Sequence, residues 1–263
     1  MKNGHKESIN MEMIKCQLSI NRFTKSKPDT EVIRDIIKTD SLLETLLLDT
    51  EFIAKSKNVE LVFELQEVMS NYKGITEYTR NKIYIKVRDD LTSEYILPIF
   101  AHELGEAHYL LSSLPIITSG SGELISNSCE FIPRINEIFT HLHVQQWLRR
   151  NKVYCLHDQL DKLDSLSWIN KDYSNAYNNE GERILYLLWA LVTFPSFRLY
   201  KEKNPYYRSK ENIVWSIVQK ILKIDTFSSS VKNIIKDTME EIIFILEKYE
   251  VKINESIKID SVF

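Results

Sequence analysis

Residues 101–108 read Ala-His-Glu-Leu-Gly-Glu-Ala-His, and they lie in an apolar run from Leu91 to Leu114 that predicts one helix. At about 100° per residue, Glu106 lies about 40° and Glu103 about 100° around the helix from His102. These three polar side chains therefore project from one side. The remaining positions are apolar nearly all round, which predicts a helix buried on both faces.

A buried helix that carries a histidine and two glutamates must satisfy them, because unpaired buried charge is unfavourable. One solution is a metal ion, since His-Glu-x-x followed by a second ligand matches the spacing of helical metal sites. The other is an ordinary hydrogen-bonded pair between His102 and Glu106. The position where His-Glu-x-x-His has its second histidine is Glu106. His108 falls about 240° from His102 on the helical wheel, so the predicted helix ligands are His102 and Glu106.

Composition excludes several classes of function. The net charge of −3 over 263 residues gives no basic field for nucleic acid or anionic lipid, so neither partner is expected. Cys16, Cys129 and Cys155 form no Cys-x-x-Cys pair, which favours a reducing cytosol, and the last two are expected to be small buried apolar residues. Residues 1–26 have no apolar stretch of signal-peptide length, and the apolar segment 184–197 is too short to span a membrane. The predicted localisation is cytoplasmic.

The hydrophobic periodicity predicts an α+β protein that is mostly helical, with a small sheet in the N-terminal third, a buried motif helix and a helical C-terminal half. The predicted organisation is a polar arm over 1–27, a domain over 28–150 and a helical region over 151–263. Predicted strands cover 16–23, 59–66, 74–79 and 82–87. One helix is predicted to begin at residue 28. Further helices are predicted over 41–55, 91–114, 123–150, 158–168, 180–203, 210–224 and 229–249. Residues 118–122 are expected to form a flexible loop, and 251–263 either a terminal strand or a tail.

A second predicted helix offers candidates for the third ligand. Glu130, Glu137 and His141 share one of its faces, and either Glu137 or His141 would complete the site. A set with Glu137 is richer in oxygen and would favour Mn or Fe, whereas a set with His141 has the usual donors of zinc. Glu130 is expected to be an ordinary surface or paired carboxylate. His143 faces another way, so one of His141 and His143 is expected to be solvated, and His157 is expected to play no part.

Three features together resemble the zincin metallopeptidases. A strand over 82–87 precedes the motif helix, Phe-Ala-His-Glu-Leu-Gly at 100–105 is similar to the active-site helix of small intracellular zincins, and Asn136-Glu137 is similar to the third-ligand helix of thermolysin-like enzymes. The resemblance covers 59–147. It implies an edge strand that pairs with substrate, a zinc ion, and a zincin-like domain over 28–150.

The expected function is metal-dependent hydrolysis of a protein or peptide in the cytosol. Glu103 would act as the general base, because it follows the His102 ligand and can reach a metal-bound water. The alternatives are a non-catalytic zincin relative, and a helical interaction or scaffold protein without metal. Nothing in the sequence predicts the oligomeric state.

Overall fold

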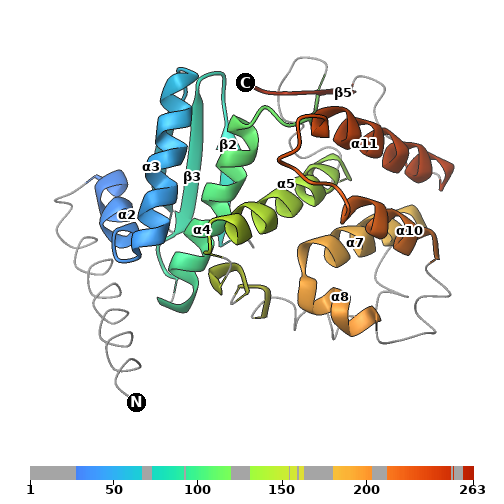
Figure 1. Cartoon of the computed structure of the whole chain (residues 1–263), viewed down its shortest axis with the longest axis horizontal. Helices are drawn as coiled ribbons and strands as arrows, with labels where there is room; N and C mark the ends of the chain where they lie inside the picture. Colours follow the sequence, from blue (N-terminus) through green and yellow to red (C-terminus); the bar gives the residue numbers. More distant parts are fainter. Residues whose placement is uncertain are drawn as a thin grey trace. The chain divides into compact units, whose positions relative to one another are not determined.

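The structure is a computed structural model (Figure 1). Its chain divides into two compact units. One unit comprises Met1–Leu111 and Trp147–Leu160, and the other Ser112–Gln146 and Asp161–Phe263. The residues that the structure describes are 28–66, 73–91, 93–119, 131–153, 155–158, 160–162, 180–202, 212–249, 251 and 257–263. The strand expected over 16–23 lies outside them.

The first unit contains a mixed three-stranded sheet in the order β1-β3-β2. Its strands are β1 (Glu60–Gln66), β2 (Gly74–Tyr78) and β3 (Lys82–Arg88). β3 has the strict alternation that its sequence predicts, since Ile83, Ile85 and Val87 are buried and the residues between them are not. It pairs parallel with β1 and antiparallel with β2. The strand directly before the motif helix is therefore central and is not the edge strand that the resemblance implies; among the described strands, β2 lies at the antiparallel edge.

Among the described residues, three helices pack with this sheet (Figure 1). They are α2 (Asp29–Ile37), α3 (Ser41–Ser56) and α4 (Ser93–Leu111). α4 is the predicted motif helix and contacts β2, β3 and α3. Phe100 and Leu104 on one side of α4 are each 1% exposed, and Ile99 on the His102 side is 4% exposed, which confirms that the helix is buried nearly all round. Pro98 lies inside α4, within the first turns of the helix.

The second unit contains a two-stranded antiparallel sheet and several helices. The strands are β4 (Ile116–Ser119) and β5 (Ile257–Asp260), and they pair Ile117 with Ile259. The strand alternative for the end of the chain is thus confirmed. The loop expected over 118–122 is wrong at its start, because Thr118 and Ser119 belong to β4.

The described helices of the C-terminal half follow the predicted order, with one difference, and the predicted helical residues 123–130 and 163–168 lie outside the described residues. They are α5 (Phe131–Arg150), α7 (Glu180–Thr193), α8 (Pro195–Glu202), α10 (Asn212–Ile221) and α11 (Val231–Lys248). The single helix predicted over 180–203 is two helices. Pro195 has no backbone N–H and cannot continue α7, but it suits the first position of α8.

Helix α5 is polar on several sides, yet most of it is buried, because its polar side chains have fixed partners. Gln145 donates to the carbonyl oxygen of Val192 at 2.8 Å. Gln146 donates to the carbonyl oxygen of Ile224 at 2.7 Å and accepts from the Thr226 backbone N–H at 2.9 Å. These hydrogen bonds give the glutamine side chains of α5 the partners that buried polar groups require.

Candidate metal centre

The motif helix α4 places His102 and Glu106 one turn apart on the same face, as the spacing predicts. The His102 Nε2 and Glu106 Oε1 atoms are 3.4 Å apart, and the side chains are 14% and 17% exposed. Ligand atoms bound to one zinc ion at 2.0–2.2 Å in a tetrahedron lie about 3.4 Å apart. The pair therefore has the separation that two ligands of one ion need, and it is also compatible with an ordinary histidine–carboxylate pair.

Helix α5 supplies His141, whose ring is fixed by a neighbour. His141 is 7% exposed, and its Nδ1 atom lies 2.8 Å from the hydroxyl oxygen of Thr193 at the end of α7. A hydrogen bond at one ring nitrogen sets the orientation of the imidazole and directs the other nitrogen to a ligand. The atom of His141 suited to bind a metal is therefore Nε2.

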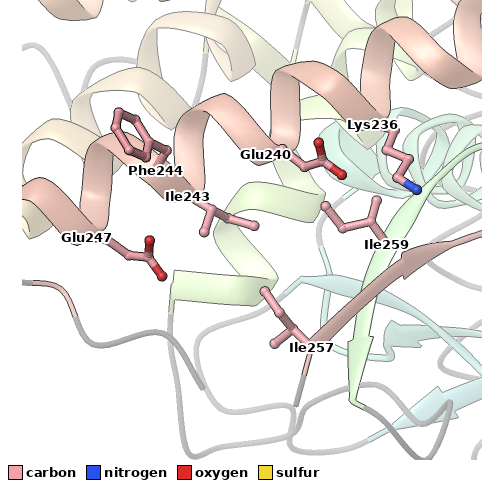
Figure 2. A pocket seen from close by; sticks show the side chains of 7 residues that line it. All are labelled: Lys236, Glu240, Ile243, Phe244, Glu247, Ile257 and Ile259. Carbon is pink, nitrogen blue, oxygen red and sulfur yellow. The ribbon is translucent and has the colours of Figure 1, made fainter. Parts of the chain in front are cut away.

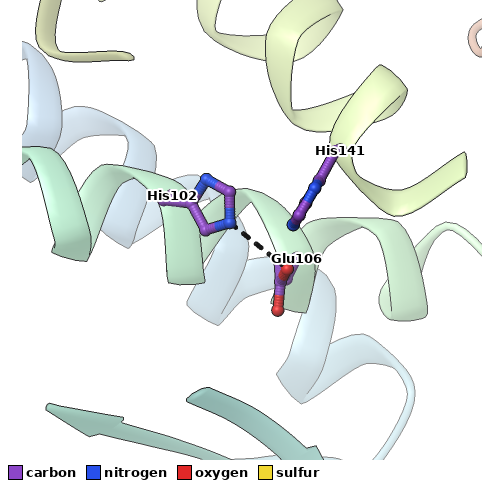
Figure 3. A group of neighbouring side chains, drawn as sticks. All are labelled: His102, Glu106 and His141. Atoms are coloured by element: carbon purple, nitrogen blue, oxygen red, sulfur yellow. Dashed lines mark ion pairs between the residues drawn. The ribbon is translucent and has the colours of Figure 1, made fainter. Parts of the chain in front are cut away.

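His102, Glu106 and His141 form a group that can hold a metal ion (Figure 3). One ligand atom from each lies within 4.8 Å of the others. The donors fit a transition metal, because two imidazoles and one carboxylate are a recurrent catalytic zinc set that keeps a fourth position open. His108 is not part of the group, as its position on the helical wheel predicts.

Glu103 is directed to the sheet by contacts with the edge strand β2. The Glu103 residue is 4% exposed, and its Oε2 atom accepts a hydrogen bond from Thr76 Oγ1 at 2.8 Å. The neighbouring Gly74 packs directly against it, since a Cβ at this position would lie 2.6 Å from Glu103 Oε1 and 2.6 Å from Ile99 Cγ2. Only glycine permits this approach of strand to helix. The sequence pattern predicts the strand over 74–79 but does not identify Thr76 or Gly74 as site residues. It does not show which residue of the motif helix this strand contacts.

The other predicted third ligand, Glu137, has a local partner. Its Oε2 atom accepts from Arg134 Nη1 at 2.6 Å, one turn earlier on α5. Among the described residues, the group that could hold a metal ion includes His141 and does not include Glu137. Glu130 lies outside the described residues.

Two expectations about side-chain environment, for the His141–His143 pair and for Cys155, are wrong. His141 and His143 are both buried, and His143 is 0% exposed. The Nδ1 atom of His143 lies 3.0 Å from Thr226 Oγ1, and its ring stacks on Phe227. His157 is 3% exposed, and its ring centroid lies 6.1 Å from that of His102, although it is not part of the group that could hold a metal ion. Cys155 is exposed and is not a buried apolar residue. No local spacing in the sequence connects position 157 with position 102, so only the fold reveals this neighbour.

His108 occupies a different environment on the far side of α4. Its ring stacks on Trp147, with centroids 4.8 Å apart. Burial lowers the pKa of His108 to about 4, so the ring is neutral at neutral pH. The stacked neutral ring is a packing element of the helix.

The chain matches no protein-family model, no curated protein and no solved structure in the comparisons with known proteins. Among the helices that the structure describes, none combines the length and the apolar character needed to cross a bilayer. The geometry of the residues therefore carries the functional interpretation alone.

Proposed function

We propose that this protein is a metal-dependent hydrolase of the cytosol that cleaves a protein or peptide substrate. The proposed ligands are His102, Glu106 and His141, with zinc as the first choice and Mn or Fe as further candidates. The observation that carries the proposal is the approach of three ligand atoms to within 4.8 Å of one another.

A bound ion of this kind would polarise a substrate carbonyl and lower the pKa of a water molecule. In the proposal, Glu103 takes the proton of that water and passes it to the leaving amine. Glu103 is buried, and the hydrogen bond from Thr76 limits the orientations that its carboxylate can adopt. Thr193 keeps the His141 ring in the orientation that exposes Nε2 to the ion.

The contact between Thr76 and Glu103 also favours a second candidate function. A carboxylate engaged by the edge strand can serve to hold α4 against β2 and take no part in proton transfer. In that case the protein would be a non-catalytic metal-binding protein. The two candidates share the metal and differ in the role of Glu103.

Elemental analysis of protein purified without chelator and without a metal-affinity tag tests for the bound metal, which both candidate functions require. We expect close to one transition-metal ion per chain, its loss in His102→Ala and His141→Ala, and its retention in Glu137→Ala. His108→Ala is the matched control on α4, and it should keep the ion because its ring stacks on Trp147. Wild-type protein without metal, or equal loss in the His102 and His108 variants, would contradict the proposal.

A cleavage assay of the Glu103→Gln variant separates the two candidates. Glutamine retains the volume and can still accept a hydrogen bond from Thr76, so the fold and the metal should persist. Loss of activity by about 10²-fold or more would support a general base. Metal-loaded wild-type protein that leaves a random peptide library uncut would favour the non-catalytic candidate.

A further inference from the structure

A groove of about 320 Å³ lies between helix α11 and strand β5, both within the second unit (Figure 2). Its apolar lining comes from Ile243 and Phe244 of α11 and from Ile257 and Ile259 of β5. Phe244 is 69% exposed, which is unusual for a large aromatic side chain on a helix. The volume is at the lower end of the range for ligand pockets.

The periodicity of both elements explains this lining. α11 buries Ile235, Met239, Ile242 and Leu246 in the interior of its unit, and the groove is lined by the adjacent helical face. β5 alternates, with Ile257 and Ile259 half-buried and the residues between and after them exposed. The groove thus lies between a second apolar face of α11 and one face of the short strand β5.

The outer edge of β5 offers backbone hydrogen-bonding groups. Asn136 accepts from the Ile117 N–H at 2.8 Å and donates to the Ile117 carbonyl at 3.0 Å, so both backbone groups of Ile117 point away from β5. Ile117 lies opposite Ile259 in the antiparallel ladder, which makes this a non-hydrogen-bonded pair. The N–H and C=O of Ile259 therefore point to the outer edge, and those of Ile257, two residues away, do the same. Within the described residues, β5 has β4 as its single neighbouring strand.

The charged residues of the groove are unequal in number. Glu240 and Glu247 line it together with one cation, Lys236. In the described part of the chain, none of these three side chains forms an ion pair or a side-chain hydrogen bond. The groove therefore has a net negative charge and suits a ligand with basic groups beside an apolar one.

We propose that this groove binds an extended peptide that adds a third strand to the β4-β5 sheet. The peptide backbone pairs with the outer edge of β5 at Ile257 and Ile259, an apolar side chain packs against Ile243, and flanking Lys or Arg side chains face Glu240 and Glu247. Strand addition beside a helix is a recurrent mode of peptide recognition, in which backbone bonds give affinity and pockets give specificity. The site is independent of the metal group and of the hydrolase proposal.

Fluorescence anisotropy with the full chain tests the peptide class. The probe is the fluorescein-labelled heptapeptide Lys-Thr-Val-Leu-Val-Thr-Lys, compared with Glu-Thr-Val-Leu-Val-Thr-Glu and with a version methylated at alternate backbone nitrogens. The basic peptide should bind about tenfold more tightly than the acidic one, and N-methylation should remove binding. Equal binding of the basic and acidic peptides, equal binding of the methylated one, or no binding at all would overturn the proposal.

Matched variants on α11 locate the site. Glu240→Lys should weaken the basic peptide about tenfold and strengthen the acidic one, whereas Asp237→Lys makes the same charge change at an exposed position outside the groove and should alter neither. Phe244→Ser removes an exposed apolar wall without disturbing the core and should weaken both peptides. Equal effects of Glu240→Lys and Asp237→Lys would overturn the site. So would a wild-type dimer in sedimentation that Phe244→Ser dissociates, since a second copy would then be the occupant.

Discussion

Thr76 in the edge strand β2 donates a hydrogen bond from Oγ1 to Glu103 Oε2 at 2.8 Å, and its hydroxyl oxygen lies 3.0 Å from the backbone carbonyl oxygen of the same glutamate. One hydroxyl group thus lies against both the side chain and the backbone of the residue next to His102. The contact joins strand β2 to the motif helix. It makes the orientation of Glu103 dependent on strand β2.

Loss of this hydroxyl should destabilise the first unit. Thr76→Val keeps the volume but leaves a buried carboxylate oxygen without its donor, which should lower the free energy of unfolding by about 1–3 kcal/mol. Thr76→Ser restores the donor and should be closer to the wild type. Urea unfolding of the three proteins measures the difference. Equal stability of the valine and serine variants would show that the bond contributes nothing.

Gly74→Ala should be destabilising because the added Cβ has no room. It would lie 2.6 Å from both Glu103 Oε1 and Ile99 Cγ2, so the strand or the helix must shift. Overpacking of this kind costs about 1–3 kcal/mol, although Gly to Ala in a strand is otherwise favourable by roughly 0.5–1 kcal/mol. Thermal unfolding of Gly74→Ala, Ile99→Ala and the double variant measures the coupling. If the two effects simply add, the close approach is not the cause.

The sequence predicts the elements whose pattern is local. The alternation of Ile83, Ile85 and Val87 predicts β3, and the apolar surround of His102 predicts a helix buried nearly all round; both are confirmed. These signals depend on residues within one element, where side-chain direction follows directly from backbone geometry.

Contacts between distant segments leave no local pattern in the sequence. They determine the strand β4, the neighbours of His102 and His141, and the choice of the third ligand. The pairing of Ile117 with Ile259 joins segments far apart in the chain, so β4 could not be distinguished from a loop. His157 lies beside His102, and Thr193 fixes His141, for the same reason. The choice between Glu137 and His141 likewise depends on how α5 is placed, which the helical wheel of α5 alone does not determine.

Asn136 should be important for the second sheet, because it satisfies the outer edge of β4. Asn136→Leu leaves the N–H and C=O of Ile117 without their partner and should cost about 1–3 kcal/mol. Asn136→Asp keeps the acceptor for the N–H but places a carboxylate oxygen against the carbonyl. Amide exchange at Ile117 should therefore accelerate in the leucine variant and remain slow in the aspartate variant. Thr140→Val, which removes only a bond within α5 to the Asn136 carbonyl, is the control.

The stability of the first unit should fall at alkaline pH through Tyr78. Burial raises the pKa of this phenol to about 12, above the usual value of about 10. Below pH 10 the phenol is neutral in both states and has no effect; as the pH rises from 10 to 12 the unfolded state loses its proton first. The native state is therefore destabilised over this range, by less than the full pKa shift would give because Tyr78 is only partly buried. Tyr78→Phe should reduce this decline in urea unfolding between pH 10 and 12, and an unchanged decline would exclude Tyr78 as its source.

Glu106→His tests the position at which the chain departs from His-Glu-x-x-His. If Glu106 is a ligand, histidine recreates the usual pair on a face already arranged for it, and zinc affinity should be kept or raised. If Glu106 is only the partner of His102, the substitution removes one member of a partly buried pair, and up to about 3–5 kcal/mol of stability would be lost without any gain in metal.

Zinc titration and thermal unfolding of the same Glu106→His protein distinguish the two cases. Glu137→His is the matched control, because Glu137 pairs with Arg134 and lies outside the His102–Glu106–His141 group. That variant should bind zinc no more tightly than the wild type. A large fall in the melting temperature of Glu106→His with no zinc binding would remove Glu106 from the ligand set. The proposed hydrolase would then lack the second ligand on its motif helix.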